Sequence, residues 1–139
     1  MRGTIIYSER DGEAAEYARL LGRQFNFPAI NSGTSSLRKV TASQALLIVS
    51  SLTGGILSIQ KWMNRNLVLL KGKKLFLFVV TKNLAEKPER LNRLVSEDIP
   101  SEIRQACEVF YLPGDIADKE LGLTHNLAAE IAARLYVSS

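Results

Sequence analysis

The chain has 139 residues, of which 46% are hydrophobic and 23% charged, and its net charge is +4. This length suits one domain with a real core, over residues 1–139, and the composition is that of an ordinary soluble globular protein. The longest apolar runs, 45–49 and 75–80, are too short to span a bilayer. A single cysteine excludes an internal disulfide, and no signal-like segment follows Met1, which predicts a cytoplasmic location.

The first predicted elements are a strand, a polar loop and a helix. The apolar run 4–7 ends at Ser8, and the loop 9–12 follows it. The helix then places one apolar face inward, formed by Ala14, Ala18, Leu21 and Phe25. The N–H groups of a helix N-terminus, at the carboxyl end of a strand, are a common phosphate site.

Further strand-like runs alternate with helical patterns. Strands are predicted at 46–50, 75–80 and 108–112, with a weaker one near 28–31. Helical spacing covers segments 35–42, 59–70, 91–95 and 127–135, and the last of these carries a favourable pair between Glu130 and Arg134. Pro100 and Ser101 predict a short helical turn that Ser101 caps.

Alternation of this kind predicts an α/β fold, a three-layer α/β/α sandwich around a central parallel sheet of four to five strands. Ligands of such sheets bind beyond the carboxyl ends of the strands. Three loops are expected at that edge, at 8–13, 50–57 and 112–117.

These loops resemble those of flavodoxins, and most closely those of the menaquinone-dependent protoporphyrinogen oxidase branch. The first loop of that branch reads Ser-Thr-x-Asp-Gly-x-Thr, and this chain has Ser-Glu-Arg-Asp-Gly-Glu-Ala at 8–14. Segment 48–55 stands where the branch has a loop with Gly-Ser and an aromatic-glycine pair. The run Asn-Leu-Ala-Glu-Lys-Pro-Glu at 83–89 matches an Asn-Leu-x-x-Lys-Pro-Glu pattern.

The resemblance implies a flavodoxin-like domain that binds FMN and takes part in electron transfer or oxidoreduction, at most as an FMN-dependent oxidoreductase or electron carrier. Hydroxyls and backbone N–H groups would hold the phosphate, and glycine would allow close approach. No side chain is implied to be catalytic. The implied cofactor-binding residues are Ser8, Glu9, Arg10, Asp11, Gly12, Glu13, Ser51, Leu52, Thr53, Gly54, Gly55, Leu112, Pro113 and Gly114.

Several residues depart from the family pattern. Glu9 and Ala14 replace threonines, and Gly54 stands where an aromatic ring is usual. A carboxylate about 5 Å from the phosphate would cost roughly 3 kcal/mol per phosphate charge. Asp11 and Glu13 could instead satisfy the helix N-terminus themselves. The branch also carries a long insertion near the last strand that this chain lacks.

Two functions therefore stay open: an FMN-binding redox protein, and a flavin-less interaction or regulatory module that keeps the fold. Trp62 and Tyr111 are expected in the core and at a strand end. His125 is the only histidine, so no metal site is expected. Cys107 is expected to be a buried structural thiol.

The segment from Lys61 to Arg93 holds nine cations and only two acids. It is either a solvated surface or a docking surface for an acidic redox partner or an anionic membrane. The aromatic residues of this segment, Trp62, Phe76 and Phe78, fall on the apolar face of a predicted helix and in a predicted buried strand, so nucleic acid is not expected as a partner.

Overall fold

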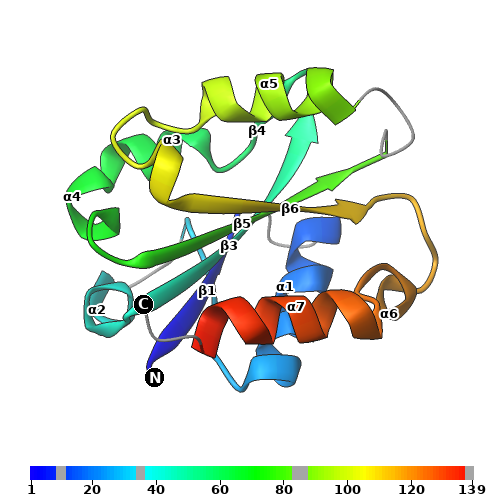
Figure 1. Ribbon diagram of the computed structural model, residues 1–139, viewed down its shortest axis with the longest axis horizontal. Helices are drawn as coiled ribbons and strands as arrows, with labels where there is room; N and C mark the ends of the chain where they lie inside the picture. Colours follow the sequence, from blue (N-terminus) through cyan, green and yellow to red (C-terminus); the bar gives the residue numbers. More distant parts are fainter. Residues whose placement is uncertain (9–11, 34–36, 83–87, 137–139) are drawn as a thin grey trace.

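The computed structural model describes residues 1–8, 12–33, 37–82 and 88–136, and the figures draw them as ribbon (Figure 1). In chain order the elements are β1 (Gly3–Tyr7), α1 (Glu13–Phe25), β2 (Ala29–Asn31), α2 (Leu37–Ala42), β3 (Ala45–Thr53), β4 (Ile56–Leu57), α3 (Gln60–Arg65), α4 (Leu67–Leu70), β5 (Lys74–Thr81), α5 (Pro88–Asp98), the 3₁₀ turn η1 (Arg104–Ala106), β6 (Cys107–Pro113), α6 (Lys119–Gly122) and α7 (His125–Tyr136).

Five strands form a parallel sheet in the order β2-β1-β3-β5-β6, and β4 pairs antiparallel with β3. The chain moves outward from β1 to β2 and then crosses to β3, so the winding direction reverses between β1 and β3. This is the point at which doubly wound sheets bind ligands. The prediction of an α/β/α sandwich is confirmed, including the weak strand near 28–31.

Two hydrophobic cores cover the two faces of the sheet. On one face α1 and α7 pack against strand residues such as Ile5, Val49 and Phe78. On the other face, helices α2 to α5 pack against Ile6, Ile48 and their neighbours. Because the inner strands are buried on both sides, most of their positions are apolar, and this explains the continuous apolar runs in the sequence.

The segment predicted as a loop at 50–57 is a β-hairpin. Strand β3 continues to Thr53, three residues past its predicted end, and Thr53 pairs with Ile56 across a two-residue turn. Gly54 and Gly55 have φ of 60° and 77°. Positive φ at both central residues defines a type I′ turn, whose twist matches that of the flanking strands.

Two smaller expectations were wrong in detail. The helical pattern at 59–70 forms two helices, since Asn66 leaves the helical conformation and its side-chain amide donates to the carbonyl of Trp62. The Ser101 hydroxyl donates to the Glu102 carboxylate and does not cap the following turn, whose N-cap residue is Ile103. Helix α6 was not predicted; Asp118 caps it by accepting from the Glu120 N–H.

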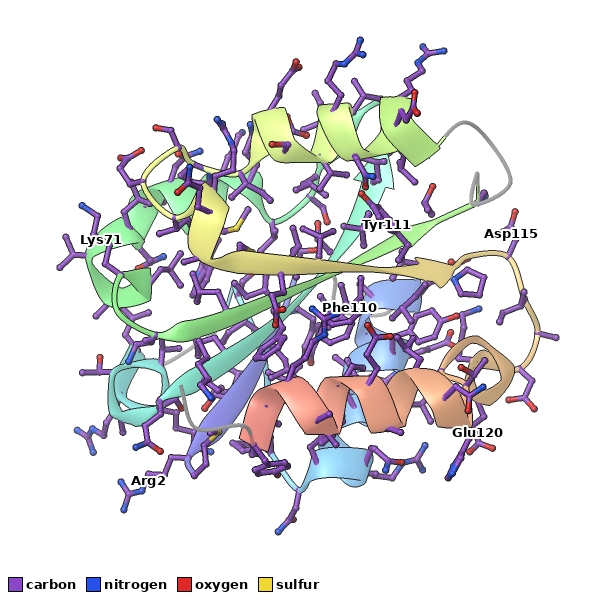
Figure 2. All side chains as sticks on the ribbon, viewed as in Figure 1. Arg2, Lys71, Phe110, Tyr111, Asp115 and Glu120 are labelled. Carbon is purple, nitrogen blue, oxygen red and sulfur yellow. The ribbon has the colours of Figure 1, made fainter. Side chains whose placement is uncertain are left out.

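Charged residues lie beyond both edges of the sheet. Figure 2 shows Arg2 and Lys71 at one end of the molecule and Asp115 and Glu120 at the other. The first end is the amino edge of the parallel strands, where Arg2 precedes β1 and Lys71 precedes β5. The second is the carboxyl edge, where Asp115 follows β6.

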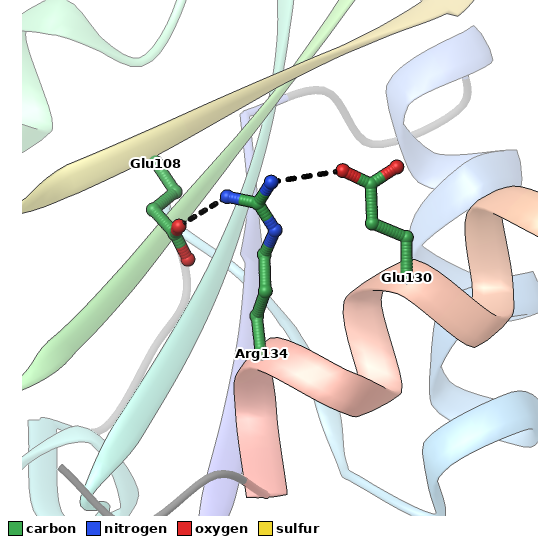
Figure 3. Close-up of polar contacts among 3 residues, drawn as sticks. All are labelled: Glu108, Glu130 and Arg134. Carbon is green, nitrogen blue, oxygen red and sulfur yellow. Dashed lines mark hydrogen bonds and ion pairs between the residues drawn. The ribbon is translucent and has the colours of Figure 1, made fainter.

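Arg134 links helix α7 to the edge strand β6, in addition to the packing of α7 on the core. Arg134 pairs with Glu108 of β6 at 2.5 Å and with Glu130 one helical turn earlier at 3.0 Å (Figure 3). Its guanidinium also lies 5.8 Å from the centroid of the Phe110 ring. The predicted Glu130–Arg134 pair is therefore confirmed, and the contact to β6 extends it.

Candidate functional site

Four serine hydroxyls meet where β1 and β3 end, and we call them the hydroxyl cluster. Ser8 directly follows β1, Ser50 and Ser51 lie near the end of β3, and Ser58 follows β4. The Ser58 hydroxyl oxygen lies in hydrogen-bond contact with that of Ser8, 3.2 Å from that of Ser50 and 3.1 Å from that of Ser51. The cluster thus joins three strands at the reversal point of the sheet.

The hairpin brings the cluster together. Its tight turn returns the chain so that the Ser58 N–H donates to the Ser51 carbonyl at 3.0 Å. The far side of the hairpin is held by α5, whose Asp98 carboxylate accepts from the Leu57 N–H at 2.9 Å. Ser50 is fully buried, and its hydroxyl oxygen accepts from the Ile59 N–H at 3.2 Å.

The structure divides the predicted first loop between two places. Ser8 joins the hydroxyl cluster, whereas the Glu13 carboxylate accepts from the Asp115 N–H at 3.1 Å, in the loop after β6. Gly114 is buried against this carboxylate: a Cβ on it would lie 2.6 Å from a Glu13 oxygen. Gly12 is the N-cap residue of α1. Glu9, Arg10 and Asp11 lie outside the described residues.

The predicted residues of the second loop serve mainly the hairpin. Leu52 and Thr53 pair with β4, while Gly54 and Gly55 form its turn, with open space around both. The positive φ values of the turn thus explain why residues 54 and 55 are glycines. Of the predicted residues in this loop, only Ser51 belongs to the hydroxyl cluster.

The predicted residues at the end of β6 are tied to the fold. The Leu112 side chain is fully buried in the core. The Pro113 carbonyl accepts from the Tyr17 hydroxyl at 2.5 Å. Burial, followed by the nearby carboxylates of Glu13 and Glu16, raises the pKa of Tyr17 to about 12. Here only backbone groups would be available to a cofactor.

The aromatic rings considered in the sequence have structural contacts. Trp62 is half-buried against the core on the α2–α5 face. Tyr111 donates its hydroxyl to the Asn92 side chain of α5 at 2.5 Å. Neither the Tyr111–Asn92 hydrogen bond nor the packing of Trp62 involves a serine of the hydroxyl cluster.

Metal and thiol chemistry find no support in the described part of the chain. No group of three or more His, Cys, Asp or Glu residues there is placed to hold a metal ion. Cys107 is buried, and burial followed by the charge of Glu108 raises the pKa of its thiol to about 12. Because the thiolate is the reactive form, a thiol with so high a pKa is inert at neutral pH. No helix in the described residues is long and apolar enough to cross a membrane.

Ser50 and Ser58 were not predicted as site residues. They carry no motif of their own in the sequence, and Ser58 becomes a neighbour of Ser8 only through the hairpin. A pair of glycines between two short apolar runs was the available signal, since it is the composition that a two-residue hairpin turn requires.

No protein-family model matches this sequence, and no curated protein matches it. Solved structures do match over the whole chain. A flavodoxin from the domain Archaea has a TM-score of 0.64 at 17% identity, covering 99% of this chain and 100% of that one. The fold is flavodoxin-like.

Two further structures support the same conclusion. The Trp repressor binding protein from Bacillus subtilis matches with a TM-score of 0.61 at 14% identity, over 99% of both chains. An NAD(P)H:quinone oxidoreductase from Methanothermobacter marburgensis matches with a TM-score of 0.61 at 10% identity, over 100% of this chain and 98% of that one. At these identities the likeness concerns the flavodoxin-like fold, and the resemblance to the protoporphyrinogen oxidase branch stays a prediction.

Proposed function

We propose that this flavodoxin-like chain binds FMN beyond the carboxyl ends of β1 and β3 and acts as a redox protein. The observation that carries the proposal is the hydroxyl cluster at the reversal point of the sheet. Hydroxyls suit the oxygen-rich ribityl phosphate of FMN, because each one can donate to a phosphate oxygen and accept from a ribityl hydroxyl.

The similar structures include a flavodoxin and a quinone oxidoreductase, and both agree with this proposal. Ser8 and Ser51 would bind the ribityl phosphate, and the N–H groups at the start of α1 would add donors to the phosphate. Bound FMN would supply the electron chemistry. The role of this chain is to bind and orient it.

A specific set of observations favours a second function, a flavin-less interaction module. Glu13 places a carboxylate in the first turn of α1, where a phosphate would otherwise benefit from the helix dipole. The glycines of the second loop are used by the hairpin turn, and this loop offers no ring for stacking on a flavin.

Binding of FMN separates the two functions. The protein is purified with and without added FMN, and its visible flavin absorbance and melting temperature are measured. A ligand at 100 times its Kd stabilises by about 2.7 kcal/mol, which is several degrees for a chain of this size. A colourless protein whose melting temperature ignores saturating FMN would contradict the redox function and favour the interaction module.

A substitution tests the phosphate end of the proposed site. Glu9→Thr replaces an acid of the first loop by the residue of the family pattern, so FMN should bind about ten- to a hundredfold tighter. Glu102→Thr makes the same charge change before β6, at the opposite edge of the sheet, and should leave the affinity unchanged. Equal affinities of wild type and Glu9→Thr would show that Glu9 does not face the phosphate. Riboflavin, which lacks the phosphate, should respond to neither substitution.

A further inference from the structure

The Ser58 hydroxyl oxygen is the centre of the hydroxyl cluster. Besides the hydroxyls of Ser8, Ser50 and Ser51, it lies 3.2 Å from the Ser51 N–H nitrogen and 3.4 Å from the Ser51 carbonyl oxygen. The surrounding groups come from the ends of two separate strands, β1 and β3.

This oxygen has more neighbours than it can satisfy. A serine hydroxyl donates one hydrogen bond and accepts two, whereas five polar atoms surround that of Ser58. Three of these five, the Ser51 N–H and the hydroxyls of Ser8 and Ser51, are able to donate to it, whereas the Ser50 hydroxyl donates to the Ser51 carbonyl at 3.0 Å. A convergence of donors on one point is the arrangement that a strong acceptor oxygen, such as that of a phosphate, requires.

We propose that the Ser58 hydroxyl occupies the position of a ligand oxygen and competes with the ligand for it. The inference rests on the proposed function, and the ligand oxygen is a phosphoryl or hydroxyl oxygen of the ribityl phosphate. Ser58 is thus an affinity-determining residue: the ligand enters by taking over the donors of Ser8 and Ser51.

The surroundings of Ser58 allow this exchange. Ser58 is an exposed residue, so its hydroxyl can rotate into water and recover hydrogen bonds there. Its N–H keeps the bond to the Ser51 carbonyl, and Leu57 keeps its bond to Asp98, because neither involves the Ser58 side chain. A change of one rotamer therefore opens the position while the hairpin stays paired.

Removing the hydroxyl should tighten ligand binding. In Ser58→Ala a water molecule takes the position of the lost hydroxyl. Immobilising that water costs entropy, whereas the serine hydroxyl is already held near the position by its own backbone, so the water competes with the ligand less strongly than the hydroxyl does. FMN should therefore bind about three- to tenfold more tightly to Ser58→Ala than to wild type, while Ser51→Ala, which removes a donor, should bind it more weakly. Ser101→Ala, an exposed serine before β6, is the matched control and should leave the affinity unchanged.

The test is a calorimetric or fluorescence titration of FMN into wild type, Ser58→Ala, Ser51→Ala and Ser101→Ala, with unfolding curves to verify that each variant folds. Tighter binding to Ser58→Ala with weaker binding to Ser51→Ala supports the inference. If wild type binds FMN and Ser58→Ala binds it equally or more weakly, Ser58 is a ligand contact or a bystander, and the inference alone is overturned. If no variant binds FMN, the proposed function fails and the inference fails with it.

Discussion

At the scale of single residues, Gly122 of α6 shows how closely this fold is packed around Tyr17. A Cβ on Gly122 would lie 2.0 Å from the Tyr17 hydroxyl oxygen and 2.9 Å from the ring carbon that bears it. That hydroxyl is itself held by the Pro113 carbonyl. One tyrosine of α1 thus fixes both the end of β6 and the position of α6.

Gly122→Ala should destabilise the protein by about 1–3 kcal/mol, because an added methyl group in a well-packed core forces its neighbours to move. In a Tyr17→Phe background the same substitution should cost less, since the closest clashing atom is absent. Urea unfolding of the two single variants and the double variant measures the difference. If the effects of the two substitutions on the free energy of unfolding are additive, the close contact between Gly122 and Tyr17 is contradicted.

The sequence could not reveal such a residue. Gly122 is the last residue of a short helix, and nothing in its sequence neighbours indicates that Tyr17, more than a hundred residues earlier, packs on it. By contrast, the burial of Cys107 was predicted correctly, because a lone cysteine at the start of an apolar strand has few other roles. The burial of a residue can be predicted from its neighbours in the sequence, whereas a contact between distant segments is visible only in the folded structure.

At the scale of elements, the β3–β4 hairpin is the feature that most changes the interpretation of the sequence. The loop that resembled a flavin-binding loop is a paired hairpin with Ser51 and Ser58 at its base. The inner strands β1 and β5 were predicted to within one residue at each end, because burial on both faces leaves a continuous apolar run. The hairpin was missed since its second strand has only two residues, too few for a periodic pattern.

The turn itself gives a prediction. Gly55→Val should destabilise the protein by about 1–2 kcal/mol, because a β-branched residue strongly disfavours the φ of 77° that Gly55 adopts. Gly54→Asn should be nearly neutral, since Asn-Gly is a preferred pair for a type I′ turn. Denaturant unfolding of both variants provides the comparison. A Gly55→Val variant as stable as wild type would show that the turn is not of this type.

At the scale of the whole molecule, the basic stretch of the sequence is divided in space. Lys73 donates to the carbonyls of Thr41 and Ser43, and Lys82 pairs with Asp115 at 3.2 Å. Lys71 is exposed at the amino edge, at the same end of the molecule as Arg2 (Figure 2). Docking on an anionic membrane or an acidic partner should use this end, which leaves the carboxyl edge accessible.

Charge reversal at the two ends tests this expectation. Binding to vesicles that contain phosphatidylglycerol should fall about five- to tenfold in Lys71→Glu, because each cation near an anionic surface contributes about 1 kcal/mol. Lys82→Glu makes the same change at the opposite edge and should alter binding little. Added salt should weaken the binding. An equal loss of vesicle binding in both variants, or no binding of the wild type to vesicles, would contradict docking of the end that carries Arg2 and Lys71 on a membrane.

The strand order also has a consequence for the time course of folding as the chain is synthesised. β1 is made first among the described strands but lies inside the sheet, between β2 and β3. Its pairing with β2 becomes possible early, whereas its other edge stays open until residues 45–49 of β3 have been added. During that interval an apolar strand edge is exposed on the nascent chain, and this is the kind of species that chaperones protect from aggregation.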